Sequence, residues 1–391
     1  MTDFIGQAEE LFEFTRDLRR DLHRHPELGF QEIRTAGIVA RELRNLGLEV
    51  TTGIGRTGVV AMLEGGREGP TLLLRFDMDA LPIQEETGAE YASTLPGVMH
   101  ACGHDGHTAV GLAVSHLLHG IRDELSGKVK LVFQPAEEGA GGAQSMLVDG
   151  VLENPRPDRS LALHLWNEHP VGWFGVSPGP TMSAAESFQV RLIGKGGHGA
   201  SPHLAVDPVV ASAQLINQLQ TIVSRNVSAL DSSIISVTQI QGGHAHNVIP
   251  MHVDIKGTIR YYRQDVGDLI HRRFKEVVDG VAISSGCKAE IETIDVCPAV
   301  VNDPELTERV ARRTRELFPD EVVETDFQLM GSEDMSVFMN EIPGCYFFVG
   351  SADSGRGLNA PHHHPKFDFD EKALIYATAL MAAAAQDFLS G

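Results

Sequence analysis

Short apolar runs alternate with helical patterns along most of this 391-residue chain. The runs have the length and composition of strands that are buried on both faces. Because strands that alternate with helices form a largely parallel or mixed sheet covered by helices, the pattern predicts an α/β fold with a sheet sandwiched between helices. The clearest strand candidates are residues 59–63, 71–76, 129–133 and 161–165.

The rhythm changes between about residues 184 and 293, where the pattern becomes strand, helix, strand, strand, helix, strand. Such a βαββαβ unit is a complete two-layer sandwich, so we expect a ferredoxin-like domain inserted into the first one. A chain of this length also favours two domains over one. The expected division is a first domain of residues 1–183 plus 298–391 and an inserted domain of residues 184–297.

The charge balance restricts the partners of this chain. It has 53 Asp and Glu residues against 32 Lys and Arg residues, and its formal charge of -21 would repel both nucleic acid and an anionic membrane surface. The N-terminal segment lacks the basic and apolar regions of a signal peptide, and the apolar runs fall short of the ~20 residues of a membrane span. Four cysteines are too few to staple the fold, so we expect reduced thiols in the cytoplasm.

Polar side chains follow several of the expected strands. Open α/β sheets bind their ligands at the carboxyl ends of the strands, so these side chains are expected to meet at one edge of the sheet although they are far apart in sequence. They are Asp77 and Asp79 after residues 71–76, Glu137 and Glu138 after residues 129–133, and His164 at the end of residues 161–165.

The densest group of potential metal ligands is the segment His-Ala-Cys-Gly-His-Asp-Gly-His at residues 100–107. Cys102 and His104 are two residues apart, so a thiolate and an imidazole can reach one cation from a loop. Gly103 and Gly106 would let the backbone fold closely around it. The segment alone leaves open a histidine-rich helix start with a buried thiol.

The adjacent carboxylates of Glu137 and Glu138 are a second candidate. Two neighbouring carboxylates repel each other, and a cation would stabilise them in a buried site. If one binds the metal, the other lies close enough to move a proton during hydrolysis. An exposed pair of glutamates in a loop is common, and this motif alone does not exclude it.

Histidines supply the remaining candidates. His164 lies within an apolar run, where a hydrogen-bonded core histidine is the usual explanation, and the three histidines at residues 362–364 could be a surface feature. Neither group is specific by itself. Together with the two clusters above, however, they provide nitrogen, oxygen and sulfur ligands, a mixture that favours a borderline transition metal over magnesium or calcium.

Several segments, in order along the chain, resemble the aminoacylase and carboxypeptidase family of dinuclear metallohydrolases. The similarity is greatest to its hippurate hydrolase and auxin-conjugate amidohydrolase branch, and it extends from about Leu18 to the C-terminal helix. Many members of the wider family have a histidine where this chain has Asp77. The matching segments are residues 75–82, 100–107, 134–138, 163–166, 194–200, 246–250 and the segment around His363.

The resemblance implies an amidohydrolase that cleaves the amide bond of N-acyl amino acids with two divalent metal ions, either Mn, Zn, Ni or Co. It makes Glu137 the general base, and Asp77 and Asp105 become supporting residues. His363 is preferred to its neighbours because the family's ligand stands two residues before a proline, here Pro365. The implied metal ligands are Cys102, His104, Glu138, His164 and His363.

The resemblance also assigns a role to the inserted domain, which would be a lid and would form a homodimer. His198 would stabilise the developing oxyanion, from its own or the neighbouring subunit. Asn247 and Arg260 would help to hold the substrate carboxylate. A guanidinium suits that task because it can donate paired hydrogen bonds to a carboxylate, although Arg260 on its own could equally be a solvated strand residue.

Two other classes of protein are compatible with parts of the sequence. A cysteine hydrolase would use Cys102 as nucleophile and a histidine as base, but it would leave Glu138, His164 and His363 without a task. A protein that binds metal or amino acids without chemistry is the second alternative. Against it, Glu137 would be a costly extra charge beside Glu138.

Overall fold

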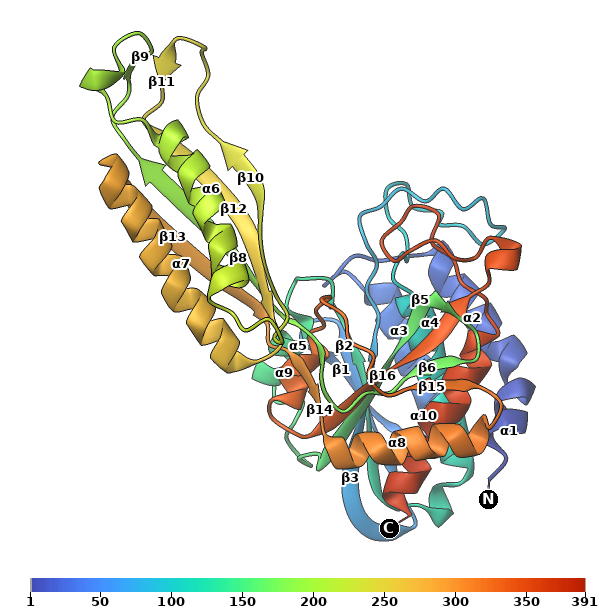
Figure 1. Ribbon diagram of the computed structural model, residues 1–391. Coiled ribbons are helices and arrows are strands. Elements are labelled where there is room, and N and C mark those ends of the chain that lie inside the picture. Colours follow the sequence, from blue (N-terminus) through green and yellow to red (C-terminus); the bar gives the residue numbers. More distant parts are fainter. Residues whose placement is uncertain (1, 391) are drawn as a thin grey trace. The chain divides into compact units, whose positions relative to one another are not determined.

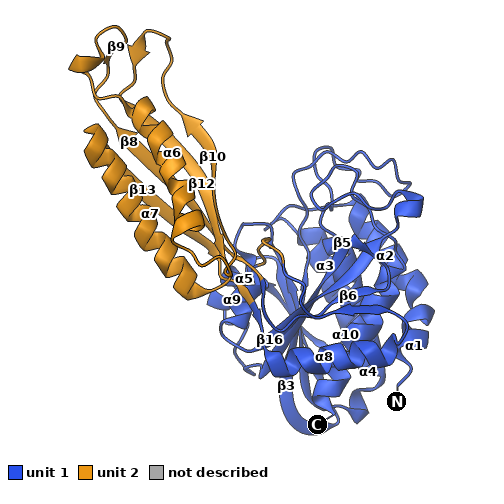
Figure 2. Cartoon of the chain, in the orientation of Figure 1, with its two compact units in different colours: residues 1–181, 301–328, 334–391 blue, residues 182–300, 329–333 orange. Residues whose placement is uncertain are grey.

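The computed structural model describes residues 2–390, and the chain divides into two compact units (Figure 2). Unit 2 lies between parts of unit 1 in the sequence and also includes a short return segment later in the chain. Unit 1 consists of Met1–Thr181, Val301–Gln328 and Asp334–Gly391, and unit 2 consists of Met182–Val300 and Leu329–Glu333.

Unit 1 contains an eight-stranded mixed sheet in the order β1-β2-β4-β3-β5-β16-β6-β15 (Figure 1). Its four central strands, β4, β3, β5 and β16, run parallel, and antiparallel pairs lie toward both edges. This arrangement confirms the α/β fold with a mostly parallel sheet. The strands are β1 (Glu49–Ile54), β2 (Gly58–Glu64), β3 (Arg67–Asp77), β4 (Ser126–Gln134), β5 (Arg159–Pro170), β6 (Trp173–Gly175), β15 (Val322–Glu324) and β16 (Gly344–Ala352).

Helices α4 and α10 pack directly on this sheet, and α1 and α2 cover them. Both inner helices are buried along almost their whole length, and the alanines of α10 combine high helix propensity with close packing. Helices α5 and α9 contact each other and also β4 and β5, respectively. The helices are α1 (Phe4–Glu10), α2 (Phe12–Arg24), α3 (Ile33–Asn45), α4 (His104–Gly120), α5 (Gly142–Val148), α8 (Pro304–Leu317), α9 (Met335–Met339) and α10 (Ala373–Leu389).

Unit 2 is an antiparallel sheet in the order β10-β12-β8-β13 with two helices packed on it. Together with the chain order β8, α6, β10, β12, α7, β13, this is the expected ferredoxin-like arrangement. Helix α6 begins where the Asp207 side chain accepts hydrogen bonds from the next turn and Pro208 occupies the first position. The elements are β8 (Ala184–Ile193), α6 (Pro208–Arg225), β10 (Ser233–Gln241), β12 (His252–Tyr261), α7 (Gln264–Ser285) and β13 (Lys288–Cys297).

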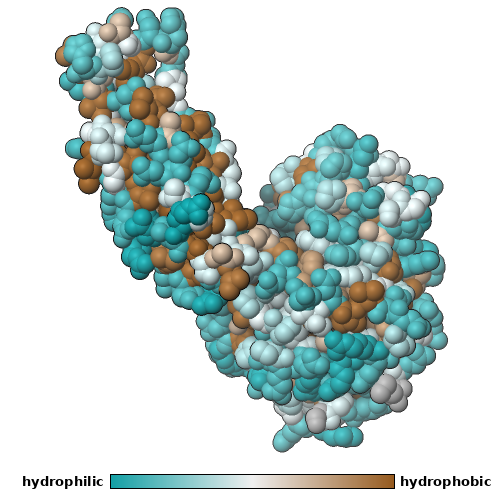
Figure 3. All heavy atoms as spheres, viewed as in Figure 1, coloured by the Kyte–Doolittle hydropathy of each residue, from teal (hydrophilic) through white to brown (hydrophobic). Residues whose placement is uncertain are grey.

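The two faces of the unit 2 sheet differ. Along β12, Val253, Ile255 and Ile259 are buried in the core beneath the helices, and Lys256 lies on the other face and is exposed. Apolar side chains also reach the outer surface of this unit (Figure 3), among them Val209 and Val210 of α6 and Ile283 of α7. Shorter elements are β7 (Gly179–Met182), which pairs with β14 (Val300–Asn302), β9 (Gly197–His198), which pairs with β11 (Val248–Ile249), and the 3-10 helices Arg122–Glu124, Pro202–Leu204 and Ser354–Arg356.

The expected strand end at residue 165 is wrong. Strand β5 continues to Pro170, so His164 lies inside the strand and not at its end. The reason is that polar residues after Leu165 continue the ladder with β16 as far as the pairing of Ala352 with Pro170. Within residues 2–390, none of the helices is both long and apolar enough to span a membrane, and no disulfide joins the four cysteines.

Candidate metal centre

The five predicted ligands lie together in unit 1 although they come from four separate segments. The ligand atoms of Cys102, His104 and His164 are all within 4.8 Å of one another. The same is true of Cys102 with Glu138 and His363, and of His104 with Glu137 and Glu138. These overlapping sets form one continuous group, called the ligand cluster below: Cys102, His104, Glu138, His164 and His363, with Glu137 beside it.

Local backbone geometry brings the Cys102 segment into place. Gly103 has a positive φ of 88° and precedes α4, so the chain turns sharply between the thiol and His104, the first residue of that helix. The carbonyl oxygen of Ala101 accepts a hydrogen bond from the backbone N–H of His363 at 2.8 Å. This bond fastens the C-terminal histidine segment to the loop that carries Cys102.

Hydrogen bonds fix the orientation of the two buried histidines. Nδ1 of His104 lies 3.0 Å from the carbonyl oxygen of Asp79, and Nδ1 of His164 donates to the carbonyl oxygen of Leu165 at 2.7 Å. In both rings Nε2 is therefore the nitrogen left to carry a proton or a cation. Nε2 of His104 is buried without a hydrogen-bond partner, and Nε2 of His164 lies 3.5 Å from the sulfur of Cys102.

His107, the last residue of the Cys and His segment, has a different role. Its Nδ1 donates to Asp77 at 2.6 Å, and its Nε2 accepts the backbone N–H of Leu165 at 2.9 Å. Both ring nitrogens are occupied by protein groups, so His107 supports the site and is not a metal-ligand candidate. The other oxygen of Asp77 accepts a 2.6 Å hydrogen bond from Arg75 and also lies 3.9 Å from His104 Nε2.

The three consecutive histidines occupy different environments. His363 is half-exposed, and its Nε2 lies 3.2 Å from the Glu138 carboxylate. His362 packs against the Trp166 ring, and its Nε2 accepts a backbone N–H. His364 turns back on its own loop and accepts the N–H of Lys366. Of the three histidines, His363 is therefore the one that contacts Glu138 of the ligand cluster.

The electrostatics of the ligand cluster are those of a site that lacks positive charge. Burial raises the pKa of the Cys102 thiol, and the carboxylates of Glu138 and Glu137 raise it further. Burial alone would lower the pKa of His104, but nearby carboxylates, chiefly Asp77 and Asp79, raise it to about 10. The surrounding carboxylates thus favour the charged form of His104 and the neutral form of the Cys102 thiol. The donor set and the unpartnered Nε2 therefore fit divalent cations, which would stabilise all of these groups in their charged forms.

The residues predicted to contact the substrate, His198, Asn247 and Arg260, lie in unit 2 at two separate places. His198 pairs with Val248 across β9 and β11, and the Gly199 N–H donates to the Asn247 carbonyl oxygen at 2.8 Å. His198 and Asn247 also line one surface pocket. Arg260 lies on β12 eight residues beyond His252, about 26 Å away at about 3.3 Å per residue. Unit 2 thus brings His198 and Asn247 together, and Arg260 lies at the other end of its sheet.

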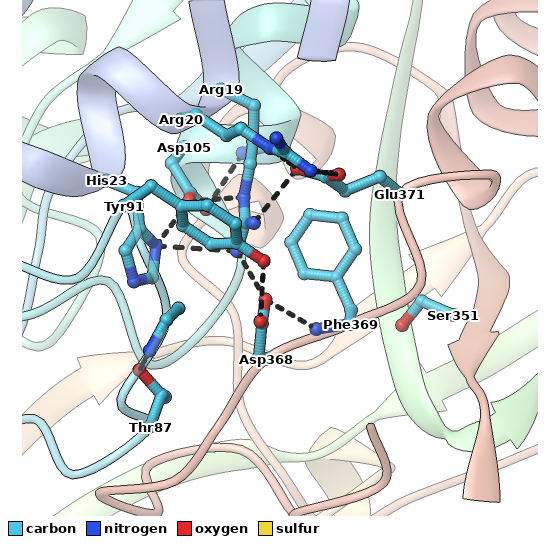
Figure 4. A network of polar contacts seen from close by, with 12 residues as sticks. Arg19, Arg20, His23, Thr87, Tyr91, Asp105, Ser351, Asp368, Phe369 and Glu371 are labelled. Carbon is cyan, nitrogen blue, oxygen red and sulfur yellow. Dashed lines mark hydrogen bonds and ion pairs between the residues drawn. The ribbon is translucent and has the colours of Figure 1, made fainter. Parts of the chain in front are cut away.

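Sequence reasoning missed Arg19 and Asp368. Arg19 is fully buried on α2 and binds Asp105, the predicted supporting residue, while its second partner Asp368 follows the His363 segment (Figure 4). Arg19 lies three residues before Leu22, so both are on the buried face of α2. That shared face was the signal in the sequence that could have identified it.

Thiol, imidazole and carboxylate groups gathered beside a mostly parallel sheet define a candidate metallohydrolase. Comparison with known proteins agrees with this class. Residues 73–387 match the model of the peptidase family M20/M25/M40, and the chain belongs to this family of hydrolases. The resemblance seen in the sequence is therefore confirmed.

Relatives match this chain over nearly its full length. An N-acetylcysteine deacetylase of Bacillus subtilis is 38% identical over 370 residues, which are 94% of this chain and 95% of the relative. An IAA-amino acid hydrolase of Arabidopsis thaliana is 36% identical over 389 residues, 98% of this chain and 88% of the relative. A crystal structure of a dinuclear metal binding M20 peptidase from Bacillus subtilis is 33% identical, with a TM-score of 0.86 and coverage of 97% and 99%.

Proposed function

We propose that this protein is a metal-dependent amidohydrolase that cleaves the amide bond of N-acyl amino acids and releases a carboxylic acid and a free amino acid. The observation that carries the proposal is the convergence of one thiol, three imidazoles and two adjacent carboxylates in unit 1. The relatives support the substrate class, because two of them are named for acting on an N-acetyl amino acid and on an IAA-amino acid.

The proposed cofactor is a pair of divalent ions, Mn, Zn, Ni or Co, held by the five residues of the ligand cluster. Bound cations of this kind polarise the amide carbonyl and make water more acidic. The protein's contribution is the orientation of the ligands. Asp79 and the Leu165 carbonyl set the ring orientations of His104 and His164, and the supporting pair of His107 and Asp77 lies directly behind them.

Glu137 is the proposed general base. Its carboxylate belongs to the same group of ligand atoms as His104 and Glu138, so it is close to the place where an attacking water would be held. It would take a proton from that water and later return it to the nitrogen of the departing amine. Glu138, the neighbouring carboxylate, would remain a metal ligand throughout the reaction.

We propose that His198 and Asn247 reach the substrate from the second subunit of a dimer. An N-acyl amino acid is much shorter than the ~26 Å that separate Arg260 from the His252 end of the same sheet, so one copy of unit 2 cannot present both groups to one substrate. Arg260 and Asn247 would then bind the substrate carboxylate from different subunits, and His198 would stabilise the oxyanion. Exposed apolar residues such as Val210 and Ile283 are consistent with a partner surface on unit 2.

The metal-dependent reaction is tested by removing and restoring the metal. Protein treated with a strong chelator and dialysed would be reconstituted with Mn, Zn, Ni or Co and assayed on N-acetyl, N-benzoyl and indole-acetyl amino acids. We expect no turnover without metal and full recovery with at least one of the four. The panel also identifies the acyl group and amino acid that the enzyme prefers.

The same experiment separates the two alternative classes. A cysteine hydrolase would survive chelation and lose activity permanently on alkylation of Cys102. The raised pKa of that thiol argues against a nucleophile, because reactive cysteines have lowered pKa values. A binding protein without chemistry would bind acyl amino acids tightly in its metal-loaded form and would turn none of them over. Either result would contradict the proposed reaction.

The dimer is tested by mixing two inactive variants, Glu137→Ala and His198→Ala. If His198 acts across the dimer, a mixed dimer has one site with both residues intact. Equal amounts of the two chains should then recover about a quarter of wild-type activity, since half of the dimers are mixed and each has one working site. No recovery after verified subunit exchange would place both residues on the same chain.

A further inference from the structure

Arg19 of α2 is the centre of a buried polar network (Figure 4), which includes Asp105, the residue directly after His104 of the ligand cluster. Its Nε donates to Asp105 at 2.8 Å, and one terminal nitrogen donates to Asp368, also at 2.8 Å. The other terminal nitrogen lies 3.3 Å from Glu371. Three carboxylates therefore surround one guanidinium that has no exposed surface. Together with His23, these residues are called the Arg19 network: Arg19, His23, Asp105, Asp368 and Glu371.

The carboxylates that Arg19 binds belong to the two segments that carry proposed metal ligands. Asp105 directly follows His104 in the first turn of α4, and Asp368 is five residues after His363. Apart from the backbone hydrogen bond between His363 and Ala101, the Arg19 side chain is a second connection between these segments. It reaches them from a helix near the N-terminus that contributes no ligand itself.

The surroundings of Arg19 hold its guanidinium in one orientation. The group lies 4.3 Å from the Phe369 ring centre and 4.9 Å from that of Tyr91, and the Tyr91 hydroxyl donates to the second oxygen of Asp368 at 2.7 Å. His23 Nδ1 contacts the same Asp105 oxygen as Arg19, at 2.7 Å. A planar group with donors at fixed angles sets the relative position of its acceptors in a way that a lysine ammonium does not.

Stability alone does not account for such a network. Buried ion pairs lose so much hydration that well-packed apolar residues of similar volume often give equal or greater stability. What the Arg19 guanidinium provides is geometry, since its donors point to two carboxylates, one directly after His104 in sequence and the other five residues after His363.

We propose that Arg19 is a positioning residue of the metal centre, which holds the His104 and His363 segments at the separation that metal binding requires. This inference rests on the proposed function, because it takes His104 and His363 as ligands. It predicts that changing the shape of the Arg19 side chain, with its charge retained, weakens metal binding although no ligand is altered.

The test is the variant Arg19→Lys, measured as metal affinity and not only as activity. Metal-free protein would be titrated with Zn²⁺ or Mn²⁺ alone against a chelating indicator. We expect the affinity to fall by about 10- to 100-fold, the range seen when groups behind metal ligands are changed. Because the variant is weakened only in its affinity for metal, raising the metal concentration should restore turnover. KM should stay near the wild-type value.

The matched control is Arg309→Lys. Arg309 of α8 also binds an aspartate across two helices of unit 1, with its Nε 2.9 Å from Asp387 of α10, but neither residue is close in sequence to a proposed ligand. It should leave metal affinity unchanged. If Arg19→Lys does not fold, Asp368→Asn decides the same question, since Arg19 keeps its Asp105 and Glu371 partners in that variant.

The results separate the two proposals. Folded Arg19→Lys or Asp368→Asn protein that binds metal as tightly as the wild type, in a wild-type protein that does bind metal, would overturn the role of Arg19. Wild-type protein that binds none of the four metals would instead overturn the proposed function.

Discussion

Unit 1 contains two clusters of polar side chains, the Arg19 network and the ligand cluster, which meet at the neighbouring residues His104 and Asp105. They differ in how many of their buried polar atoms have a partner within the protein. In the Arg19 network, the guanidinium, the His23 ring and the carboxylate of Asp105 all have protein partners. In the ligand cluster, Nε2 of His104 is buried without one, and the Cys102 thiol is surrounded by carboxylates that raise its pKa. A buried polar group without a partner is costly. The Arg19 network is therefore complete by itself, whereas the ligand cluster is suited to an added cation.

Glu137→Gln is expected to have the largest effect. It tests the ligand cluster, where the proposed reaction takes place. The amide cannot accept a proton, so kcat should fall by about 10²- to 10⁴-fold, the usual contribution of a general base. Glu138 and the other proposed ligands remain, so the metal content of the purified variant should match that of the wild type. Both quantities are measured on the same preparation, by steady-state kinetics and elemental analysis. Normal turnover would mean that another group is the base.

His363→Ala breaks the ligand cluster at its most exposed member. Removing the imidazole should weaken metal binding by at least about 100-fold, the upper limit for changes behind the ligands. The side chain is half-exposed, so the variant should fold normally. His364→Ala is the matched control, since that ring only accepts a hydrogen bond from within its own loop. If the two variants lose affinity equally, the assignment of His363 as the ligand is wrong.

Glu85→Gln addresses the pH dependence of the Arg19 network at its rim. Burial would raise the pKa of Glu85, but His23 and Thr87 lower it, and its carboxylate also accepts the Ser93 N–H at 2.6 Å. A carboxyl group whose pKa is lower in the folded state stabilises the protein above its unfolded pKa of about 4.3, and this contribution is lost as the pH falls through the folded value.

The variant should therefore be less stable than the wild type at neutral pH, and the difference should shrink below about pH 4. In that range the wild type loses up to about 1.4 kcal/mol of unfolding free energy per pH unit through this one group. Urea unfolding of both proteins between pH 3 and pH 7 measures the difference. A difference in unfolding free energy that stays constant across this range would show that the charge of Glu85 does not contribute to stability.

The sequence predicted the centre of the fold better than its edges. Long apolar runs identified β2, β3, β4 and β5 because strands buried on both faces have few polar residues. The outer strand β1, with mostly exposed side chains, and the three-residue strands β6 and β15 have no such run. Helices α5 and α9, with seven and five residues, are too short for a clear helical period.

The site shows the same division between local and distant information. Cys102, His104 and the glutamate pair are visible because unusual residue types stand close together in sequence. Arg19 is harder to find, because an arginine in an amphipathic helix normally lies in solvent and only its helical spacing from Leu22 places it on the buried face. Its burial depends on Asp105 and Asp368, which are 86 and 349 residues away. No local pattern encodes such a pairing.

Arg20→Lys should have the smallest effect and sharpens the comparison most closely. Arg20 is adjacent to Arg19 and donates two hydrogen bonds to Glu371, at 2.8 and 2.6 Å, but a third of its side chain is exposed. Partly solvated ion pairs contribute little to stability. We therefore expect the free energy of unfolding to fall by less than about 1 kcal/mol and the metal affinity to stay unchanged. A loss of metal affinity as large as that of Arg19→Lys would show that positive charge near Glu371 is what matters. The expected contrast instead attributes the role of Arg19 to its fully buried position between Asp105 and Asp368.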